Sequence, residues 1–331
     1  MTPARIIHGD CRHVLPRLLQ AGYRGRVDLV YTDPPFGAGR IQHSDREDGL
    51  TYRDPGAETF IAEMTQVLPL LHALLSPGGS LVIHADWRAS HQLKLLLDQV
   101  FGPEGLRNEI VWKRASVQGR KAVSRQLGRV TETLFWYTRG PGWTYHPAVV
   151  SERVPLLDGK LPPGYRRDEE GRYFRTAPRG DYTDASIARL EREGRIHRTR
   201  SGGVRIKYFM ERDGDALVLP RMLGNLWTDI PDAMHLTRGE RTGYPTQKPL
   251  ALASRVIEMF SSPGDLVLDP YAGSGTAGVA AVRAGRAFIL VDVSAPAVRL
   301  AHARLKPLAG GLEIESWGAP AGPGDAQGTS E

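Results

Sequence analysis

The chain has 331 residues, of which 41% are hydrophobic and 24% are charged, a composition typical of a globular protein and not of a disordered one. It contains no run of about 18 apolar residues, so we expect no membrane span, and its first ten residues lack the apolar core of a secretory signal. Cys11 is the only cysteine, which excludes an internal disulfide and a cysteine-based zinc site and favours a cytoplasmic location.

Positive charge is concentrated in the middle of the sequence. The net charge of the whole chain is +6, but residues 113–213 hold 22 Lys or Arg against 12 Asp or Glu, a net of +10, which leaves −4 for the remainder. A basic segment in an otherwise acidic protein indicates a polyanionic partner. A solvated charged surface is the alternative interpretation.

The first third of the chain alternates short apolar strands with amphipathic helices. Strands are expected at residues 4–10, 27–33, 80–86 and 108–114, and helices at 60–75 and 91–102, the first of them ended by the sequence SPGG. Strands that alternate with helices of this length predict a mostly parallel α/β sheet with helices on both faces.

The middle of the chain changes character at about residue 115. One more strand of the sheet is expected at residues 129–139, but residues 144–211 have few long apolar runs and are predicted to be irregular, with one short helix at 184–193. We interpret residues 115–238 as a basic insertion or small subdomain.

The last part of the chain returns to the α/β pattern. Helices are expected at 251–260 and 295–305, strands within 262–270 and 286–294, and a glycine-rich loop entering a helix at 271–285. The predicted domains are therefore 1–114, the insertion 115–238, 239–308, and a loose tail at 309–331. If the two α/β parts share one sheet, the strand ends at Asp33 and Asp269 can meet in one crevice, as ligands bind at the carboxyl ends of such strands.

The glycine-rich loop, LDPYAGSGTAGVAA, has the layout of a nucleoside site. Gly273 and Gly275 lie between a strand and a helix, where backbone N–H groups can approach a ligand, and Asp292 ends the next strand, where a carboxylate can bind ribose hydroxyls. No Lys follows the last glycine, so this is not a phosphate loop of the Walker type. A tight turn without a ligand is the alternative.

The stretch TDPPF places an acid on a stiff turn directly after a buried strand. Pro34 and Pro35 fix the backbone, so Asp33 has a defined direction and Phe36 follows at a fixed offset. A carboxylate, the Pro34 carbonyl and an aromatic face are the groups that would hold an exocyclic amino group on a flat base. A strand-ending turn with a core phenylalanine is the alternative.

TDPPF, with PTQKP and DPYAGSGT downstream, resembles the S-adenosylmethionine-dependent DNA amino-methyltransferases, and the motif order is that of their beta class. The resemblance covers residues 6–113 and 238–305. It implies a Rossmann-like methyltransferase sheet, circularly rearranged, with the basic insertion as the target-recognition region. Gly37 stands where many relatives have Asn, and Tyr271-Ala272 where many have Phe-Cys or Phe-Ala.

The resemblance also assigns functional residues by position. The catalytic motif corresponds to Asp33, Pro34, Pro35 and Phe36. The cofactor site corresponds to Asp10, Thr246, Gln247, Lys248, Asp269, Tyr271, Ala272, Gly273, Ser274, Gly275, Thr276 and Asp292. No metal is expected, and Cys11 has no catalytic task.

The expected reaction is direct methyl transfer to a base that has left the DNA duplex. Asp33 as the first residue of the motif favours the 6-amino group of adenine. The 4-amino group of cytosine is the alternative acceptor. An enzyme that methylates RNA or protein and a non-catalytic DNA-binding subunit are also compatible with the motifs. Double-stranded DNA is the expected partner, with a cognate restriction endonuclease and a homodimer as further possibilities.

Overall fold

The computed structural model describes residues 4–39, 41–43, 51–114, 125–157, 159–232, 236–237 and 239–317, of which 41–43 and 51–53 are described by their backbone alone. The chain divides into two compact units, one made of Met1–His146 with Gly224–Glu331 and the other of Pro147–Leu223. Within the described residues, no helix is long and apolar enough to cross a membrane.

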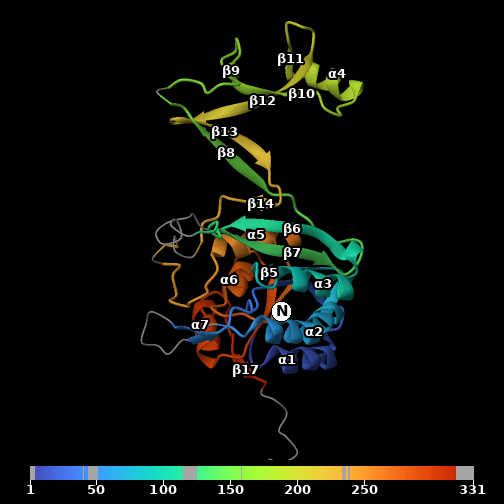
Figure 1. Cartoon of the computed structure of the whole chain (residues 1–331), viewed down its shortest axis with the longest axis vertical. Helices are drawn as coiled ribbons and strands as arrows, with labels where there is room; N and C mark the ends of the chain where they lie inside the picture. The colour runs from blue at the N-terminus through green and yellow to red at the C-terminus, as the bar shows by residue number, and fades with distance from the viewer. Residues whose placement is uncertain are drawn as a thin grey trace, which may run out of the picture. The chain divides into compact units, whose positions relative to one another are not determined.

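The first unit is built around a nine-stranded sheet (Figure 1), whose strands lie in the order β14-β6-β7-β5-β2-β15-β16-β1-β17. All neighbours pair in parallel except β7, which is antiparallel to both β5 and β6. The strands are β1 (Ala4–His8), β2 (Val27–Thr32), β5 (Leu75–Ala85), β6 (Leu106–Lys113), β7 (Thr131–Thr138), β14 (Leu226–Trp227), β15 (Leu266–Asp269), β16 (Ala287–Asp292) and β17 (Ile314–Ser316). The predicted α/β class with a mostly parallel sheet is confirmed.

Helices cover both faces of this sheet (Figure 1): α1 (Cys11–Leu18), α2 (Ala57–Leu74) and α3 (Ser90–Phe101) on one face, and α5 (Leu250–Phe260), α6 (Thr276–Arg283) and α7 (Ala295–Leu305) on the other. Successive strand residues point to opposite faces, so Ile7, Val30 and Leu81 pack in one buried core with α1–α3. Leu290 of β16 points to the other face, where its side chain lies against Gly278 of α6.

Short elements complete the first unit. They are a π-helical turn (Leu19–Tyr23), a 3-10 turn (Pro103–Gly105), and the two-stranded hairpin of β3 (Ile41–His43) and β4 (Thr51–Arg53). We expected the segment 309–331 to be a loose tail. Its residues 314–316 instead form β17, which pairs with β1 at the edge of the sheet. Residues 318–331 of that segment lie outside the described residues.

The second unit is an antiparallel sheet, so the prediction that 144–211 is irregular was wrong. Its strands follow the order β8-β13-β12-β10-β9, with β11 beside β12. Their bounds are β8 (Val149–Pro155), β9 (Tyr165–Arg167), β10 (Tyr173–Pro178), β11 (Ile196–Arg198), β12 (Val204–Asp213) and β13 (Ala216–Met222), and the predicted short helix is α4 (Asp184–Arg192). The prediction failed because β8 alternates between exposed and half-buried side chains, which gives no apolar run.

The glycine loop before α6 is shaped by the helix that lies against it. Gly275, directly before α6, has φ +76°, and a Cβ atom there would lie 2.7 Å from the Cβ of Ala301 in α7. A larger residue would therefore meet both backbone strain and a steric clash.

Gly275→Ala is expected to lower the free energy of unfolding by about 1–2 kcal/mol for the left-handed backbone and by about 1–3 kcal/mol more for the contact with α7. Gly264→Ala is the matched control, since Gly264 has φ +91° and a Cβ there would meet no described atom within 4 Å. Urea denaturation of both variants measures the difference. Equal losses would contradict the role of the α7 contact.

Candidate active site at the carboxyl ends of β2 and β15

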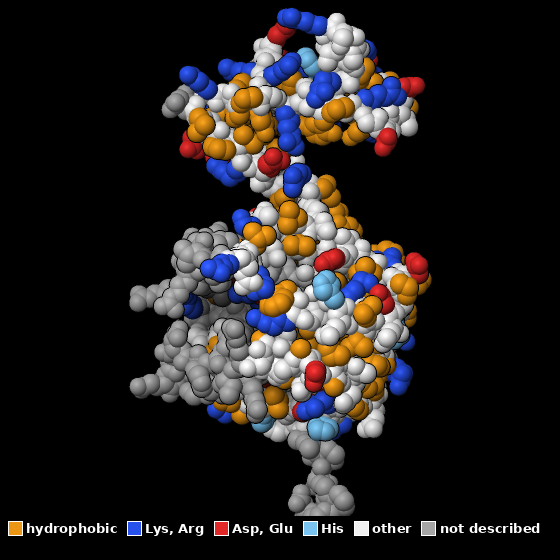
Figure 2. All heavy atoms as spheres, in the orientation of Figure 1, with side chains coloured by type: hydrophobic (Ala, Val, Ile, Leu, Met, Phe, Trp, Pro, Cys, Tyr) orange, Lys and Arg blue, Asp and Glu red, His pale blue; other side chains and the backbone are white. Residues whose placement is uncertain are grey.

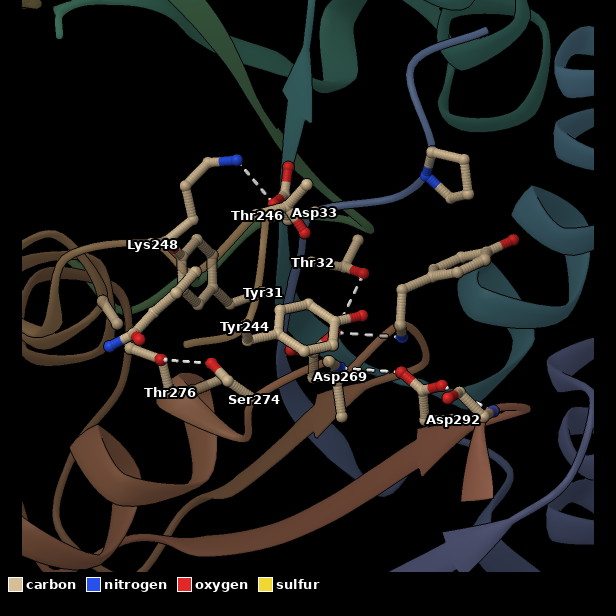
Figure 3. Close-up of a pocket in the computed structure, with 18 of the residues that line it drawn as sticks. Tyr31, Thr32, Asp33, Tyr244, Thr246, Lys248, Asp269, Ser274, Thr276 and Asp292 are labelled. Atoms are coloured by element: carbon tan, nitrogen blue, oxygen red, sulfur yellow. Dashed lines mark hydrogen bonds and ion pairs between the residues drawn. The ribbon is translucent and has the colours of Figure 1, made fainter. Parts of the chain in front are cut away.

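The two motifs identified in the sequence meet in one cavity. Strands β2 and β15 are neighbours in the sheet, with Leu29 opposite Val267 and Val30 opposite Leu268. Asp33 directly follows β2 and Asp269 ends β15, so both reach the same edge of the sheet. A cavity of about 250 Å³ opens between them (Figure 3).

Most of the predicted site residues line this cavity. They are Asp33, Pro35, Thr246, Gln247, Lys248, Asp269, Tyr271, Ala272, Gly273, Ser274, Thr276 and Asp292. The structure brings together three segments that are distant in sequence: the DPPF turn, the PTQKP segment before α5, and the glycine loop with the end of β16.

Four predicted residues do not line the cavity, and the structure shows other contacts for three of them. Asp10 is the N-cap of α1 and accepts a hydrogen bond of 2.9 Å from the Arg12 backbone N–H, so it has a structural partner. Gly275 packs against α7, as described above. Phe36 lies beside the cavity, with its ring centroid 5.0 Å from Lys248 Nζ. Pro34 is buried in the turn.

The glycine loop holds Asp292 through backbone donors. The Gly273 N–H donates to Asp292 Oδ2 at 2.7 Å, and the Ser294 N–H donates to Oδ1 at 2.8 Å. Burial raises the pKa of Asp292, while these two hydrogen bonds oppose that shift. Each carboxylate oxygen has a second lone pair, so Asp292 can still accept from a pair of hydroxyls on a ligand.

Tyr244, which also lines the cavity (Figure 3), lies directly against the same loop. A Cβ atom at Gly273, which has φ +51°, would lie 3.0 Å from the Tyr244 ring. Glycine at this position therefore leaves room for the Tyr244 ring, and a side chain there would compete with Tyr244 for the space.

A half-buried ion pair joins the DPPF turn to the PTQKP segment. Lys248 Nζ lies 2.5 Å from Asp33 Oδ2, and also 3.6 Å from Glu132 Oε2 on β7. Burial lowers the pKa of Lys248, but the charges of Asp33 and Glu132 outweigh it and leave the pKa above its ordinary value, so the side chain is a cation. Asp33 Oδ1 is buried and has no hydrogen-bond partner within the described ranges, so it is an acceptor without a donor.

Sequence reasoning missed seven residues that line the cavity: Tyr31, Thr32, Tyr244, Ala253, Ala277, Val293 and Ser294. Three of them are next to a predicted site residue, so adjacency to the motifs was a usable signal. Thr32, for example, donates through Oγ1 to Asp269 Oδ1 at 3.0 Å and links the two strands. Glu132, which lies 3.6 Å from the cavity residue Lys248, carries no motif signal.

Comparison with known proteins agrees with this geometry. The pattern of the DNA methylase family, which covers N6 and N4 methyltransferases, matches residues 27–303. The chain is 27% identical to the type II methyltransferase M.EcaI of Enterobacter cloacae, over 88% of this chain and 67% of that protein. It is 25% identical to the DNA adenine methyltransferase YhdJ of Escherichia coli, over 91% of this chain and 82% of that protein.

A solved structure shows the same fold. The M1.HpyAVI–SAM complex superposes with a TM-score of 0.54 at 19% sequence identity, covering 91% of this chain and 98% of that one. The family match over residues 27–303 confirms the resemblance drawn from the motifs. The family match covers most of the chain, so this protein belongs to the DNA methylase family of N6 and N4 amino-methyltransferases, whose methyl donor is S-adenosylmethionine.

Proposed function

We propose that the chain transfers a methyl group from S-adenosylmethionine to the 6-amino group of adenine in double-stranded DNA. The observation that carries the proposal is Asp33 Oδ1, a buried acceptor without a donor among the described residues, in the cavity that the glycine loop also lines. An amino group is the donor that such an acceptor lacks.

Adenine is favoured over cytosine by the first residue of the DPPF motif and by similarity to YhdJ, a DNA adenine methyltransferase. The family as a whole includes enzymes for both bases, so the 4-amino group of cytosine is the second candidate. The match to M.EcaI, a type II methyltransferase, supports a cognate restriction endonuclease as a partner of the enzyme. A homodimer remains an expectation from the sequence resemblance.

The residues of the cavity fit the methyl donor. Asp292, which is held by the backbone N–H groups of Gly273 and Ser294, offers acceptors to ribose hydroxyls. Thr246, Gln247 and Lys248 would lie beside the methionine part. When bound, the donor supplies a methyl group on a positively charged sulfur.

The DPPF turn would orient the acceptor. The target base must leave the duplex to expose its amino group. Asp33 and the Pro34 carbonyl then accept hydrogen bonds from the two N–H groups of this amino group, and Phe36 stacks on the base. This directs the nitrogen lone pair toward the methyl group, so that orientation and charge complementarity supply the rate enhancement.

The second unit supplies a surface suited to nucleic acid, in agreement with the proposed role of residues 115–238 in target recognition. Figure 2 shows Lys and Arg side chains interspersed with hydrophobic ones over its visible face. Arg172 lies 4.3 Å from the ring centroid of Phe209, and Arg167 lies 5.5 Å from that of Tyr173, and both rings are partly exposed. Such pairs combine phosphate attraction with aromatic surfaces for bases.

The direct test is to incubate the protein with methyl-labelled S-adenosylmethionine and unmethylated genomic DNA, and to identify the labelled nucleoside after digestion. We expect labelled 6-methyladenine. Labelled 4-methylcytosine would keep the mechanism but overturn the choice of base. Absence of label from DNA, with the methyl donor still bound, would contradict the proposed function.

Asp33→Ala is expected to reduce methyl transfer below detection while the dissociation constant of the methyl donor changes by less than about threefold, because the carboxylate orients the acceptor and not the donor. Radiolabel transfer to DNA measures the first quantity and isothermal calorimetry the second. Normal turnover by this variant would contradict the assignment of Asp33.

Asp269 gives the site a pH-dependent stability. Burial, aided by the charges of Asp33 and Asp292, raises its pKa to about 7, while hydrogen bonds from Tyr271 N–H and Thr32 oppose the shift. The native state therefore binds a proton that the unfolded state has released. This proton's contribution to the free energy of unfolding is complete below about pH 4 and is lost as the pH rises through about 7.

Asp269→Asn, which resembles the protonated side chain, is expected to remove this dependence. The free energy of unfolding of the unliganded wild type should fall between pH 4 and pH 8 relative to the variant, by up to about 4 kcal/mol at about 1.4 kcal/mol per pKa unit. Urea denaturation across this range measures it. Parallel pH profiles would show that Asp269 does not titrate in this window.

A further inference from the structure

We propose that Glu132 is a positioning residue for methyl transfer, because it withdraws Lys248 from Asp33 when the amino group of the target base arrives. The inference rests on the proposed function and assigns a task to a buried glutamate that no motif includes. It follows from the position of Lys248 between two carboxylates.

Lys248 has two possible partners and fully engages only one of them. Its Nζ atom lies 2.5 Å from Asp33 Oδ2 and 3.6 Å from Glu132 Oε2. Glu132 Oε2 is itself buried and has no hydrogen-bond partner in the described part of the chain. A shift of Nζ by about 1 Å would convert the longer contact into a hydrogen bond.

Glu132 is the fixed member of this pair. It belongs to β7, which pairs with strands on both sides, and it lies opposite Trp112 of β6. Arg114 donates to its Oε1 atom, and His84 Nδ1 lies 3.5 Å from Oε2. Burial raises the pKa of Glu132, but Lys248, His84 and Arg114 together hold it below the ordinary range, so Glu132 remains an anion.

The support behind Glu132 is also rigid. His84 of β5 is completely buried, and its Nε2 atom lies 3.1 Å from the hydroxyl of Tyr31 on β2. Lys248, by contrast, lies in the segment before α5 and carries its charge on a flexible four-carbon side chain. Lys248 is therefore the group that moves.

The move matters because Lys248 neutralises the carboxylate that the reaction uses. As the amino nitrogen forms its bond to the methyl carbon, the sulfur–carbon bond breaks and the sulfur keeps that electron pair. The nitrogen is then positively charged until it releases a proton to water. A carboxylate that is not shared with a cation stabilises this charge better. If Lys248 stayed on Asp33, its ammonium would oppose the charge at short range.

The test is Glu132→Gln, which keeps an oxygen for Arg114 but removes the charge that attracts Lys248. We expect kcat for DNA methylation to fall about tenfold or more, with little change in the KM for DNA or the dissociation constant of S-adenosylmethionine. Glu109→Gln, an exposed glutamate of the neighbouring strand β6, is the matched control. Thermal unfolding verifies that both variants are folded.

A second variant separates positioning from a structural role. In Glu132→Gln/Lys248→Met the cation that holds Asp33 is gone, so kcat should recover in part relative to Glu132→Gln alone. No recovery in the double variant, or a wild-type kcat in Glu132→Gln, would overturn the inference while wild-type activity upholds the proposed function. Failure of the wild type to methylate any DNA would overturn both.

Discussion

The site depends on the parallel pairing of β2 with β15, two strands from opposite ends of the chain. Besides the ladder between them, Asp28 accepts a hydrogen bond of 3.0 Å from the Leu266 N–H, and Thr32 donates to Asp269. The first contact joins residues 238 positions apart, and the second joins residues 237 positions apart. Without this pairing, the DPPF turn and the glycine loop would not share an edge of one sheet, and no common cavity would form.

Much of this arrangement was predictable because it is encoded locally. The strand before DPPF, the loop before α6 and the acid that ends β16 are each defined by residues next to one another, and strand ends in a parallel sheet meet at one edge. The Lys248–Asp33 pair was not predictable, because it depends on the path of the segment before α5. The role of Glu132 was not predictable either, because nothing in the sequence TETLFWY distinguishes a buried glutamate from an exposed one at the end of a strand.

The glycine loop also shows why a motif does not give one role to each of its members. Gly273 faces Tyr244, where a side chain would meet the ring. Gly275, two residues later, faces Ala301, where a side chain would push α7 away from the start of α6. Both have positive φ, which glycine permits, but the sequence alone does not show which neighbour each glycine accommodates.

The charges at the cavity explain how a cationic ligand and the Lys248 ammonium can use the same acids. Asp33, Asp269 and Asp292 all line the cavity, and the charges of Asp33 and Asp292 contribute to the raised pKa of Asp269. Lys248 relieves this repulsion at Asp33 alone. A ligand with a positive sulfur would relieve it from the other side of the cavity, which lowers the cost of leaving Asp33 unpaired when Lys248 turns to Glu132.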